Sequence, residues 1–234
     1  MEIRKYFGTT EQEVKDKKYN IFIPICLGNK FFTHKNILND NLLEYSNWAL
    51  EYTKNKVLFL VVDQIQDTNY YVRNNHSSEE ASLRRVLKDG KEVRQSLENL
   101  ALTYPQSEQD KIKIIQWEDY EKQDPFCLKT TNLVYKEFKN NKGFRERVLE
   151  VVKNSVVDRE FSEEKYWKLC DYVLDEFSLC YSGLIYEGDS YEMFIYPNVD
   201  PTSDFILEEI RNEEIFSKLK EKLPKQKSVL GILR

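Results

Sequence analysis

Four short apolar runs set the pattern of the chain. Each is rich in β-branched or aromatic residues, and the run at 57–62 reads Val-Leu-Phe-Leu-Val-Val without a polar interruption. Near-continuous hydrophobicity of this kind is typical of strands that are covered on both faces of a parallel sheet. We therefore predict strands over four segments: 20–26, 57–63, 111–117 and 191–196.

Helical periodicity fills the segments between these runs. The clearest helix begins after Ser162, whose Ser-Glu-Glu sequence is typical of an N-terminal cap, and it carries a stripe of apolar residues at helical spacing. Strand and helix alternate, which predicts an α/β fold with a mostly parallel sheet. No repeat or Gly/Ser linker divides the chain, so we expect one domain over 1–234. The predicted helices span six segments: 34–54, 78–102, 119–140, 143–154, 162–180 and 203–222.

Three chemically useful residues lie at the ends of predicted strands. These residues are Cys26, Asp63 and Tyr196. In open parallel α/β sheets, ligands bind beyond the carboxyl ends of the strands. The shared position predicts that the three side chains border one pocket.

Cys26 has two interpretations. Free cysteine is among the most buried residue types, so a small core residue is one of them. Its place at a strand end, before Gly28 and Asn29, which can shape a turn, favours a nucleophile instead. The chain has two histidines and neither adjoins Cys26, so backbone donors, a helix N-terminus or the substrate would have to activate the thiol.

Tyr172 and Glu176 stand one helical turn apart, which puts a phenol and a carboxylate on one face. A carboxylate that faces a pocket is suited to hold and deprotonate an ammonium group, whereas a solvated surface charge is the alternative. Tyr172 and Tyr196 can also be packing residues with satisfied hydroxyls. The chain has 15 tyrosines, so such coincidences are frequent.

The formal net charge of −5 argues against a protein that coats nucleic acid over its whole surface, but it leaves room for a local basic patch. Arg84, Lys88 and Lys91 follow i, i+4, i+7 spacing on a predicted helix, and Arg94 borders the same stripe. This pattern predicts a phosphate-tracking surface. Acidic residues interrupt the stripe, so a solvated, salt-bridged helix face is the alternative.

Several cofactor and targeting signals are missing from the sequence. It contains no P-loop, no G-x-G-x-x-G and no nucleotide signature of the H-I-G-H or K-M-S-K-S kind, so we expect an activity without ATP or another cofactor. Four cysteines without a C-x-x-C pair, together with two histidines, predict free thiols and no metal site. No segment approaches the roughly 20 apolar residues of a membrane span, and the N-terminus lacks a signal-peptide core. We expect a cytoplasmic protein.

The motifs taken together resemble the cyclodipeptide synthases, which join two aminoacyl groups from charged tRNAs into a diketopiperazine. Their signature is a strand followed by Ser-x-x-Asn and an aromatic residue, then Tyr-x-x-x-Glu on a later helix, then Tyr followed by His or Pro. The family nucleophile is serine, whereas this chain has cysteine. Asn29 is more typical of the Tyr-His subgroup, and the Tyr-Pro ending is similar to the other subgroup. The matching segments are Cys26-Leu-Gly-Asn29-Lys-Phe-Phe32, Tyr172-Val-Leu-Asp-Glu176 and Tyr196-Pro197.

The resemblance implies a fold similar to the catalytic domain of class I tyrosyl- and tryptophanyl-tRNA synthetases, without their ATP site. It implies that Cys26 receives the first aminoacyl group while Tyr172 and Glu176 anchor its α-amino group. Tyr196 is the expected proton relay during ring closure. The stripe on 84–94 corresponds to the basic helix with which the family binds tRNA.

The resemblance also implies where the substrate's side chain binds. We expect a first aminoacyl pocket lined by residues near the nucleophile, the helix and the last strand, with Asp63 adding a carboxylate that would select a basic or imidazole side chain. Two alternatives stay open, a non-catalytic tRNA-binding relative and a thiol acyltransferase that acts on small thioesters without tRNA. The expected substrate-binding residues are Pro24, Asn29, Asp63, Leu179, Phe194 and Pro197.

Overall fold

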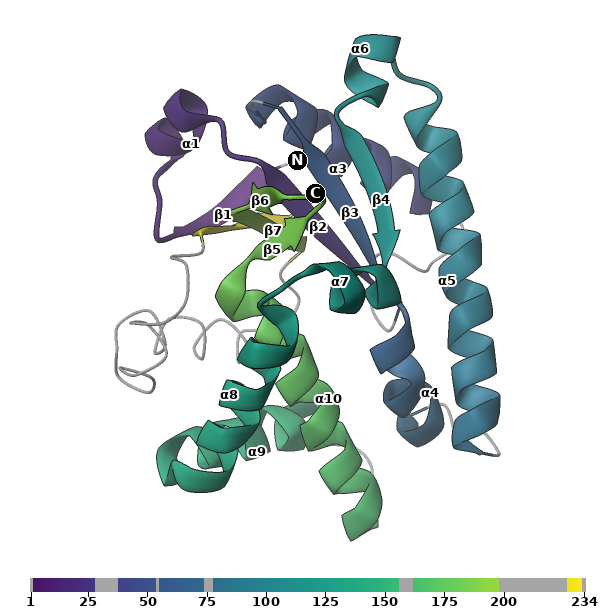
Figure 1. The fold of residues 1–234 in the computed structure, drawn as a ribbon, viewed down its shortest axis with the longest axis vertical. Helices are drawn as coiled ribbons and strands as arrows, with labels where there is room; N and C mark the ends of the chain where they lie inside the picture. The colour runs from purple at the N-terminus through teal and green to yellow at the C-terminus, as the bar shows by residue number, and fades with distance from the viewer. Residues whose placement is uncertain are drawn as a thin grey trace.

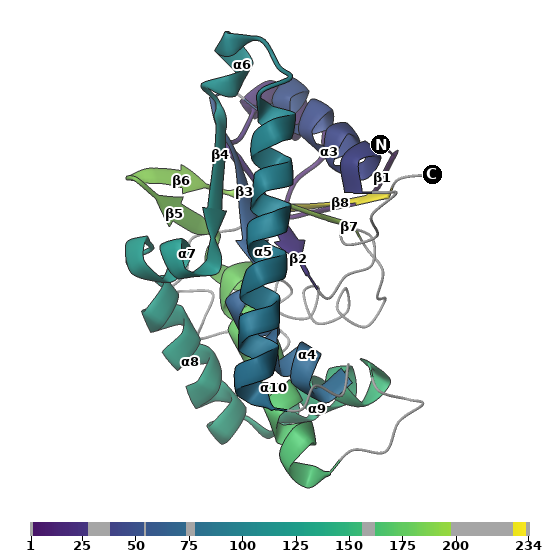
Figure 2. The ribbon, with the colours of Figure 1, turned by 90° about the vertical axis from the view of Figure 1, so that its right-hand side faces the viewer.

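A six-stranded sheet forms the upper half of the molecule (Figure 1). The computed structural model describes residues 2–27, 38–53, 55–73, 78–155, 162–197 and 227–232. Its strand order is β1-β8-β7-β2-β3-β4, with neighbours parallel except β1, which is antiparallel to β8. A separate antiparallel pair, β5 and β6, projects from one side of this sheet (Figure 2). The strands are β1 (Glu2–Phe7), β2 (Ile21–Cys26), β3 (Val57–Val62), β4 (Ile112–Gln116), β5 (Leu184–Tyr186), β6 (Asp189–Tyr191), β7 (Met193–Pro197) and β8 (Lys227–Ile232).

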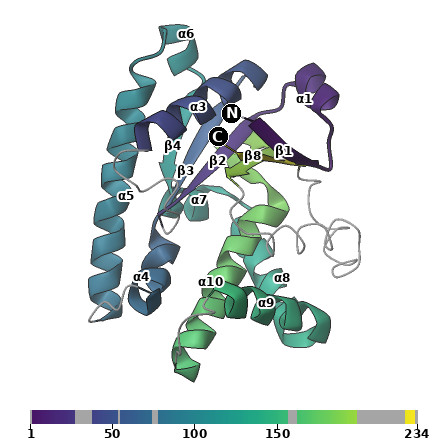
Figure 3. The same cartoon turned by 180° about the vertical axis from the view of Figure 1, so that it is seen from behind.

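Helices cover both faces of the sheet and its lower end. Figures 1 and 3 show α3 on one face and α7 on the other. The helix α5 runs along the sheet and continues past the end of β4 to α4 (Figure 2). The helices are α1 (Glu11–Lys17), α3 (Leu38–Tyr52), the 3-10 helix η1 (Gln64–Gln66), α4 (Asp67–Arg73), α5 (Glu79–Ala101), α6 (Gln106–Gln109), α7 (Trp117–Gln123), α8 (Cys127–Asn140), α9 (Lys142–Ser155) and α10 (Glu163–Ser182).

Successive side chains of β2 point alternately to the two faces of the sheet and enter two separate cores. All six residues of the strand are buried, as expected for a central strand with both faces covered. Ile21, Ile23 and Ile25 pack with residues of α3 and α5 on one face. Phe22 and Cys26 point to the opposite face, where they join residues of α7, α10 and the β5–β6 pair. The alternation therefore directs the Cys26 thiol away from α3 and towards α10.

A helical layer lies below the carboxyl ends of the strands (Figure 1). It consists of α4, α8, α9 and α10, and it has its own core, to which α9 contributes Phe144 and Val148 and α10 contributes Leu174 and Phe177. Apolar side chains at helical spacing on α10 thus pack into this core, as the sequence predicts. This packing places α10 directly beyond the ends of the strands.

The predicted strands and most of the predicted helices are confirmed. The strands β2, β3, β4 and β7 agree with the predicted segments to within two residues, and so do the helices α5, α9 and α10 at both ends. The predicted helix at 34–54 is found as α3, with 34–37 and 54 outside the described residues. The predicted helix at 203–222 also lies outside them.

One prediction is wrong, because the single helix expected over 119–140 is two helices. The break between α7 and α8 lies at Asp124 and Pro125. Proline disfavours helical geometry in the residue before it. The Asp124 carboxylate then accepts hydrogen bonds from the backbone N–H groups of Phe126 at 2.7 Å and Cys127 at 3.1 Å, which stabilises the start of a new helix.

Candidate active site

The strand order of the sheet reverses next to β2. From β2 the chain passes to β3 and β4 on one side, and β7 and β8 lie on the other side. Such a switch point is where open α/β sheets bind ligands, beyond the carboxyl ends of the strands. Cys26 is the last residue of β2, and it lies there as predicted.

Pro24 limits how far β2 pairs with β7. The Asn20 carbonyl accepts a hydrogen bond from the Met193 N–H, so the even-numbered residues of β2 turn their backbone groups towards β7. Proline has no N–H to donate on that side. The β2–β7 ladder accordingly pairs Ile21 with Met193 and Phe22 with Phe194, whereas the β2–β3 ladder continues to Cys26. Pro24 is therefore buried in the strand and coincides with the end of its pairing to β7.

The Cys26 thiol donates a hydrogen bond to a carboxylate. Its Sγ atom lies 3.3 Å from Oε1 of Glu176, although the two residues are 150 positions apart in sequence. Cys26 is 4% exposed, so this contact lies at the border of the core and not on the surface. The structure thus brings the two residues into contact, and their catalytic roles stay a prediction. From the sequence we expect backbone donors, a helix N-terminus or the substrate to activate the thiol. The contact with this carboxylate was not expected.

The Tyr172 hydroxyl lies beside the same carboxylate. Burial raises the pKa of Tyr172 well above its usual value, and the neighbouring Glu176 and Cys26 raise it further. The phenol therefore stays protonated and can donate a hydrogen bond. It also accepts one from Nε2 of Gln66 at 2.9 Å.

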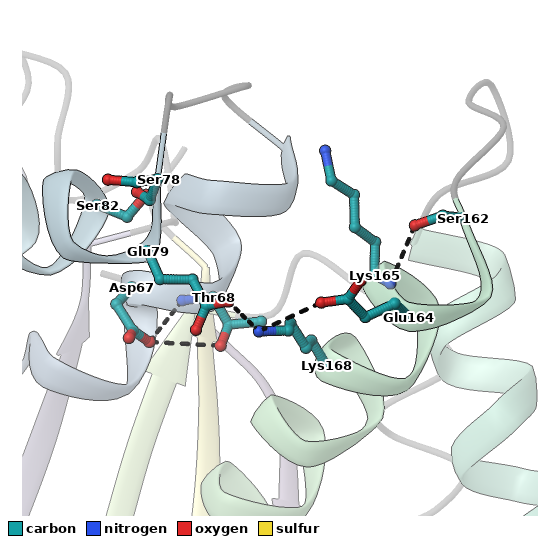
Figure 4. A network of polar contacts seen from close by, with 9 residues as sticks. All are labelled: Asp67, Thr68, Ser78, Glu79, Ser82, Ser162, Glu164, Lys165 and Lys168. Atoms are coloured by element: carbon teal, nitrogen blue, oxygen red, sulfur yellow. Dashed lines mark hydrogen bonds and ion pairs between the residues drawn. The ribbon is translucent and has the colours of Figure 1, made fainter.

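Three consecutive turns of α10 contact three different parts of the molecule. Lys168, Tyr172 and Glu176 follow i, i+4, i+8 spacing and so share one face of the helix. Lys168 forms ion pairs with Glu79 of α5 and, on its own helix, with Glu164 at 3.9 Å (Figure 4). Tyr172 contacts η1 and Glu176 contacts β2. These contacts fix the rotation of α10, which holds the phenol and the carboxylate towards Cys26.

Aromatic side chains form an apolar wall next to Cys26. Phe194 of β7 packs against Phe22, with ring centroids 5.3 Å apart, and stacks on Tyr196 at 5.7 Å with an interplanar angle of 9°. Leu179 of α10 is buried in the same cluster as Cys26 and Phe194. The structure thus brings Leu179 and Phe194, which the family resemblance places in the expected aminoacyl pocket, into one cluster with the thiol.

Asp63 is buried among other strand ends. Its carboxylate accepts hydrogen bonds from Nε2 of Gln116 at 2.6 Å, from the Gln64 N–H at 2.8 Å and from the Trp117 N–H at 3.4 Å. With 1% exposure and these partners, Asp63 has a structural role in joining β3 to β4 and α7. Its selection of a basic or imidazole substrate stays a prediction.

The basic stripe on α5 is exposed for most of its length. Arg84 pairs with Glu80 at 3.7 Å and Lys88 with Glu92 at 3.8 Å, both as exposed i, i+4 pairs, and Lys91 is also exposed. Arg94 differs, because its guanidinium donates hydrogen bonds to Glu98 at 2.9 Å and to Gln116 at 3.3 Å. Exposed pairs of this kind contribute only about 0.5 kcal/mol, so phosphate groups can replace the acidic partners.

Other predicted features fall outside this cluster or outside the described residues. Asn29 lies outside them, and the structure describes the backbone of Pro197 but not its ring. In the described ranges, no group of three or more His, Cys, Asp or Glu side chains is placed to hold a metal ion, and no helix is long and apolar enough to cross a membrane. A cavity of about 530 Å³ lies on the other side of the sheet, lined by Trp48 and Tyr52 of α3 among others.

Comparison with solved structures identifies the fold. A cyclodipeptide synthase from Bacillus thermoamylovorans is 17% identical, with a TM-score of 0.73 over 94% of this chain and 90% of that one. A Mycobacterium tuberculosis protein is 13% identical, with a TM-score of 0.69 over 98% of this chain and 95% of that one. Its structure is described as demonstrating that cyclodipeptide synthetases are related to type I tRNA-synthetases. A cyclodipeptide synthase from Candidatus Glomeribacter gigasporarum bound to Phe-tRNA is 16% identical, with a TM-score of 0.54 over 94% and 90%.

The chain therefore has the fold of the cyclodipeptide synthases, a Rossmann-like α/β fold related to that of type I tRNA synthetases. The predicted fold class is confirmed. No protein-family model and no curated protein matches the sequence.

Gln66 is the residue of this site that the sequence analysis missed. It lies in a short polar segment after β3 and contacts a residue 106 positions later, so periodicity gives no sign of it. A polar side chain directly after a buried strand, near Asp63, was the one available signal.

Proposed function

We propose that the chain is a tRNA-dependent cyclodipeptide synthase in which Cys26 carries the aminoacyl intermediate. The observation that supports it most directly is the hydrogen bond from the Cys26 thiol to Glu176, with the Tyr172 phenol beside it, at the switch point of a cyclodipeptide synthase fold. A nucleophile within hydrogen-bond reach of a base is the arrangement that covalent catalysis requires.

The first step of the proposed reaction loads the enzyme. Glu176 accepts the thiol proton as the Cys26 sulfur attacks the ester carbonyl of an aminoacyl-tRNA. The bond between the acyl carbon and the ribose oxygen breaks, and the tRNA leaves with its 3′ hydroxyl protonated. A thioester forms on Cys26. Tyr172 and Glu176 then hold the α-amino group of the bound residue.

The next two steps form the peptide bonds. The α-amino group of the residue bound to Cys26 attacks the ester carbonyl of the second aminoacyl-tRNA. The bond to the ribose oxygen breaks, which releases the second tRNA with its hydroxyl protonated and leaves a dipeptide on Cys26. The free amine of the dipeptide then attacks the thioester carbonyl, which closes the ring and returns the thiol. Tyr196 relays the proton in this step, and its ring stack on Phe194 holds it at the end of β7. The ester bonds of charged tRNA supply the driving force, so ATP has no role.

We assign the first aminoacyl side chain to the apolar wall of Leu179 and Phe194, next to Pro24, before which the pairing of β2 and β7 ends. Asn29 and Pro197 are the further substrate-binding residues of this proposal. Asp63 is proposed to act on the substrate's side chain from behind the residues that line the pocket. The two partners are aminoacyl-tRNAs, bound through the stripe of Arg84, Lys88 and Lys91 on α5, with Arg94 beside it. Charged tRNA makes the cytoplasm the site of the reaction.

The test is a reaction with total charged tRNA, followed by mass spectrometry of the small products. We expect cyclic dipeptides from the parent, none after ribonuclease treatment and none from Cys26→Ala. Product that survives ribonuclease would favour a thiol acyltransferase that uses small thioesters. Binding of tRNA without product would favour a non-catalytic relative.

A further inference from the structure

A fully buried amide follows β3 and points at the active site. Gln66, the last residue of η1, is 0% exposed. Its Nε2 donates to the Tyr172 hydroxyl at 2.9 Å, and its Oε1 accepts from Nδ2 of Asn69, in the first turn of α4, at 2.8 Å. Burying an amide is unfavourable unless it is hydrogen-bonded, and here both of its ends have partners.

The direction of these hydrogen bonds matters for the phenol. Asn69 donates to Gln66, so the glutamine oxygen faces Asn69 and the glutamine nitrogen faces Tyr172. Because the phenol oxygen accepts this bond, its own hydrogen must point elsewhere. Glu176 is the other hydrogen-bonding partner of the phenol, and its charge raises the pKa of Tyr172. The amide thereby directs the Tyr172 hydrogen to Glu176.

We propose that Gln66, held by Asn69, is a positioning residue that aims the Tyr172 hydroxyl at Glu176 and so fixes the carboxylate that accepts the Cys26 thiol. This inference rests on the proposed function and adds a residue to it. Gln66 acts through Tyr172, and as a fully buried side chain it does not touch tRNA.

The chain offers matched controls for a test. Gln64 lies in the same 3-10 helix, but its side chain is exposed. Gln66→Met removes the donor at nearly constant volume, and Gln66→Glu places an acceptor and an added negative charge against the phenol. Gln64→Met and Gln64→Glu make the same chemical changes away from it. Thermal melting of all four variants checks that the fold is retained.

With charged tRNA, we expect Gln66→Met to lower kcat for loading of Cys26 about tenfold, the effect of one typical hydrogen bond, with KM unchanged. Gln66→Glu should lower it about a hundredfold, because a like charge next to Glu176 adds to the lost donor. In a Tyr172→Phe background, Gln66→Met should have no further effect. The proposal is overturned if Gln66→Met keeps the parent kcat, if KM alone changes, or if the two substitutions are additive.

A second measurement needs no tRNA, so it separates this inference from the proposed function. Alkylation of Cys26 by iodoacetamide depends on the thiolate, which negative charge nearby disfavours. We expect alkylation of Cys26 to be slower in Gln66→Glu than in the parent and in Gln64→Glu. Equal rates in all three proteins would overturn the positioning role. A parent that alkylates as expected but accepts no aminoacyl group would contradict the proposed function alone.

Discussion

At the scale of single residues, the site joins groups that are far apart in sequence by a few polar contacts. Cys26 alone would be one more buried thiol, like Cys127 and Cys170, which burial leaves with pKa values raised to about 11 and about 12. What distinguishes Cys26 is its hydrogen bond to Glu176. A buried cysteine with a carboxylate acceptor, at a strand end, has the means to lose its proton during a reaction.

Another carboxyl on α10 predicts a pH dependence of stability. Asp175 accepts a hydrogen bond from the Tyr135 hydroxyl at 3.2 Å, and burial, followed by the nearby carboxylate of Asp171, raises its pKa from 3.8 to about 6. Between these two pKa values the native state holds a proton that the unfolded state has released. The free energy of unfolding should therefore fall as pH rises from about 4 to about 6.

We expect Asp175→Asn to remove this part of the pH dependence, because asparagine can accept the same hydrogen bond without ionising. At neutral pH the variant should be more stable than the parent by about 1–2 kcal/mol, a value reduced for the partial exposure of Asp175. Thermal melts at pH 5 and at neutral pH check this, with Asp16→Asn on α1 as an exposed control. An unchanged pH dependence in Asp175→Asn would contradict the assignment.

At the scale of elements, the close approach of α5 to the strand ends depends on one glycine. A Cβ atom at Gly90 would lie 2.6 Å from Oδ2 of Asp63 and 2.7 Å from its Cβ atom. Asp63 cannot move away easily, because Gln116, Gln64 and Trp117 hold its carboxylate. The packing of α5 against β3 and β4 therefore requires the absence of a side chain at this position.

Gly90→Ala should destabilise the protein by about 1–3 kcal/mol, the usual cost of overpacking. Elsewhere in a helix the same change is favourable by up to about 1 kcal/mol. Gly143→Ala near the start of α9 is the matched control, since its Cβ atom would meet nothing closer than Oδ1 of Asn141 at 3.5 Å. Chemical denaturation measures both, and a Gly90→Ala protein as stable as the control would refute the tight contact.

The elements differ in how far the sequence predicts them. The strands β2, β3 and β7 are predictable because burial makes them almost continuously apolar. The edge strand β4 is only partly buried, and its three β-branched isoleucines carry the signal. The edge strand β1 reads Glu-Ile-Arg-Lys-Tyr-Phe, and its mixed composition carries no such signal. The break at Pro125 was readable from the sequence.

The same limit applies to the site. Cys26, Tyr172 and Glu176 carry recognisable motifs, whereas the partner of the phenol depends on how η1 turns after β3. No periodicity encodes that turn, so Gln66 becomes visible only in three dimensions. Nor does the pattern tell a structural carboxylate such as Asp63 from one that faces a ligand.

At the scale of the whole molecule, α5 runs along the sheet and continues past its lower end to α4 (Figure 2). The basic stripe lies at and beyond the strand ends, on the same level as the candidate site, because Gly90 packs against Asp63 and Asp89 contacts Tyr70 of α4. A charged tRNA that reaches Cys26 with its 3′ end must lay its backbone on the outer surface of the protein. Arg84, Lys88 and Lys91 are the exposed cations of this stripe, whereas Arg94 is held by Glu98 and Gln116.

Replacing Arg84, Lys88 and Lys91 together with alanine should weaken tRNA binding and flatten its salt dependence, because each lost phosphate contact lowers the slope of log K against log salt by about 0.7–0.9. The control replaces Lys15, Lys122 and Lys142, which form exposed i, i+4 pairs on other helices. Both variants lose the same charge. Equal losses of affinity would contradict a specific tRNA surface on α5.

If Cys26 carries the aminoacyl group, intact-protein mass spectrometry after mixing with charged tRNA will detect that group as added mass. We expect the parent to gain the mass of one aminoacyl residue, and Cys26→Ser to be loaded as well and to form cyclodipeptide at an equal or higher rate. A thioester is less stabilised by resonance than an ester, so loading of the cysteine is less favourable although the thiolate is the better nucleophile. Cys26→Ala should gain no mass with its fold intact. An alanine variant that still gains the aminoacyl mass, or that makes product at the parent rate, would show that Cys26 is not the nucleophile.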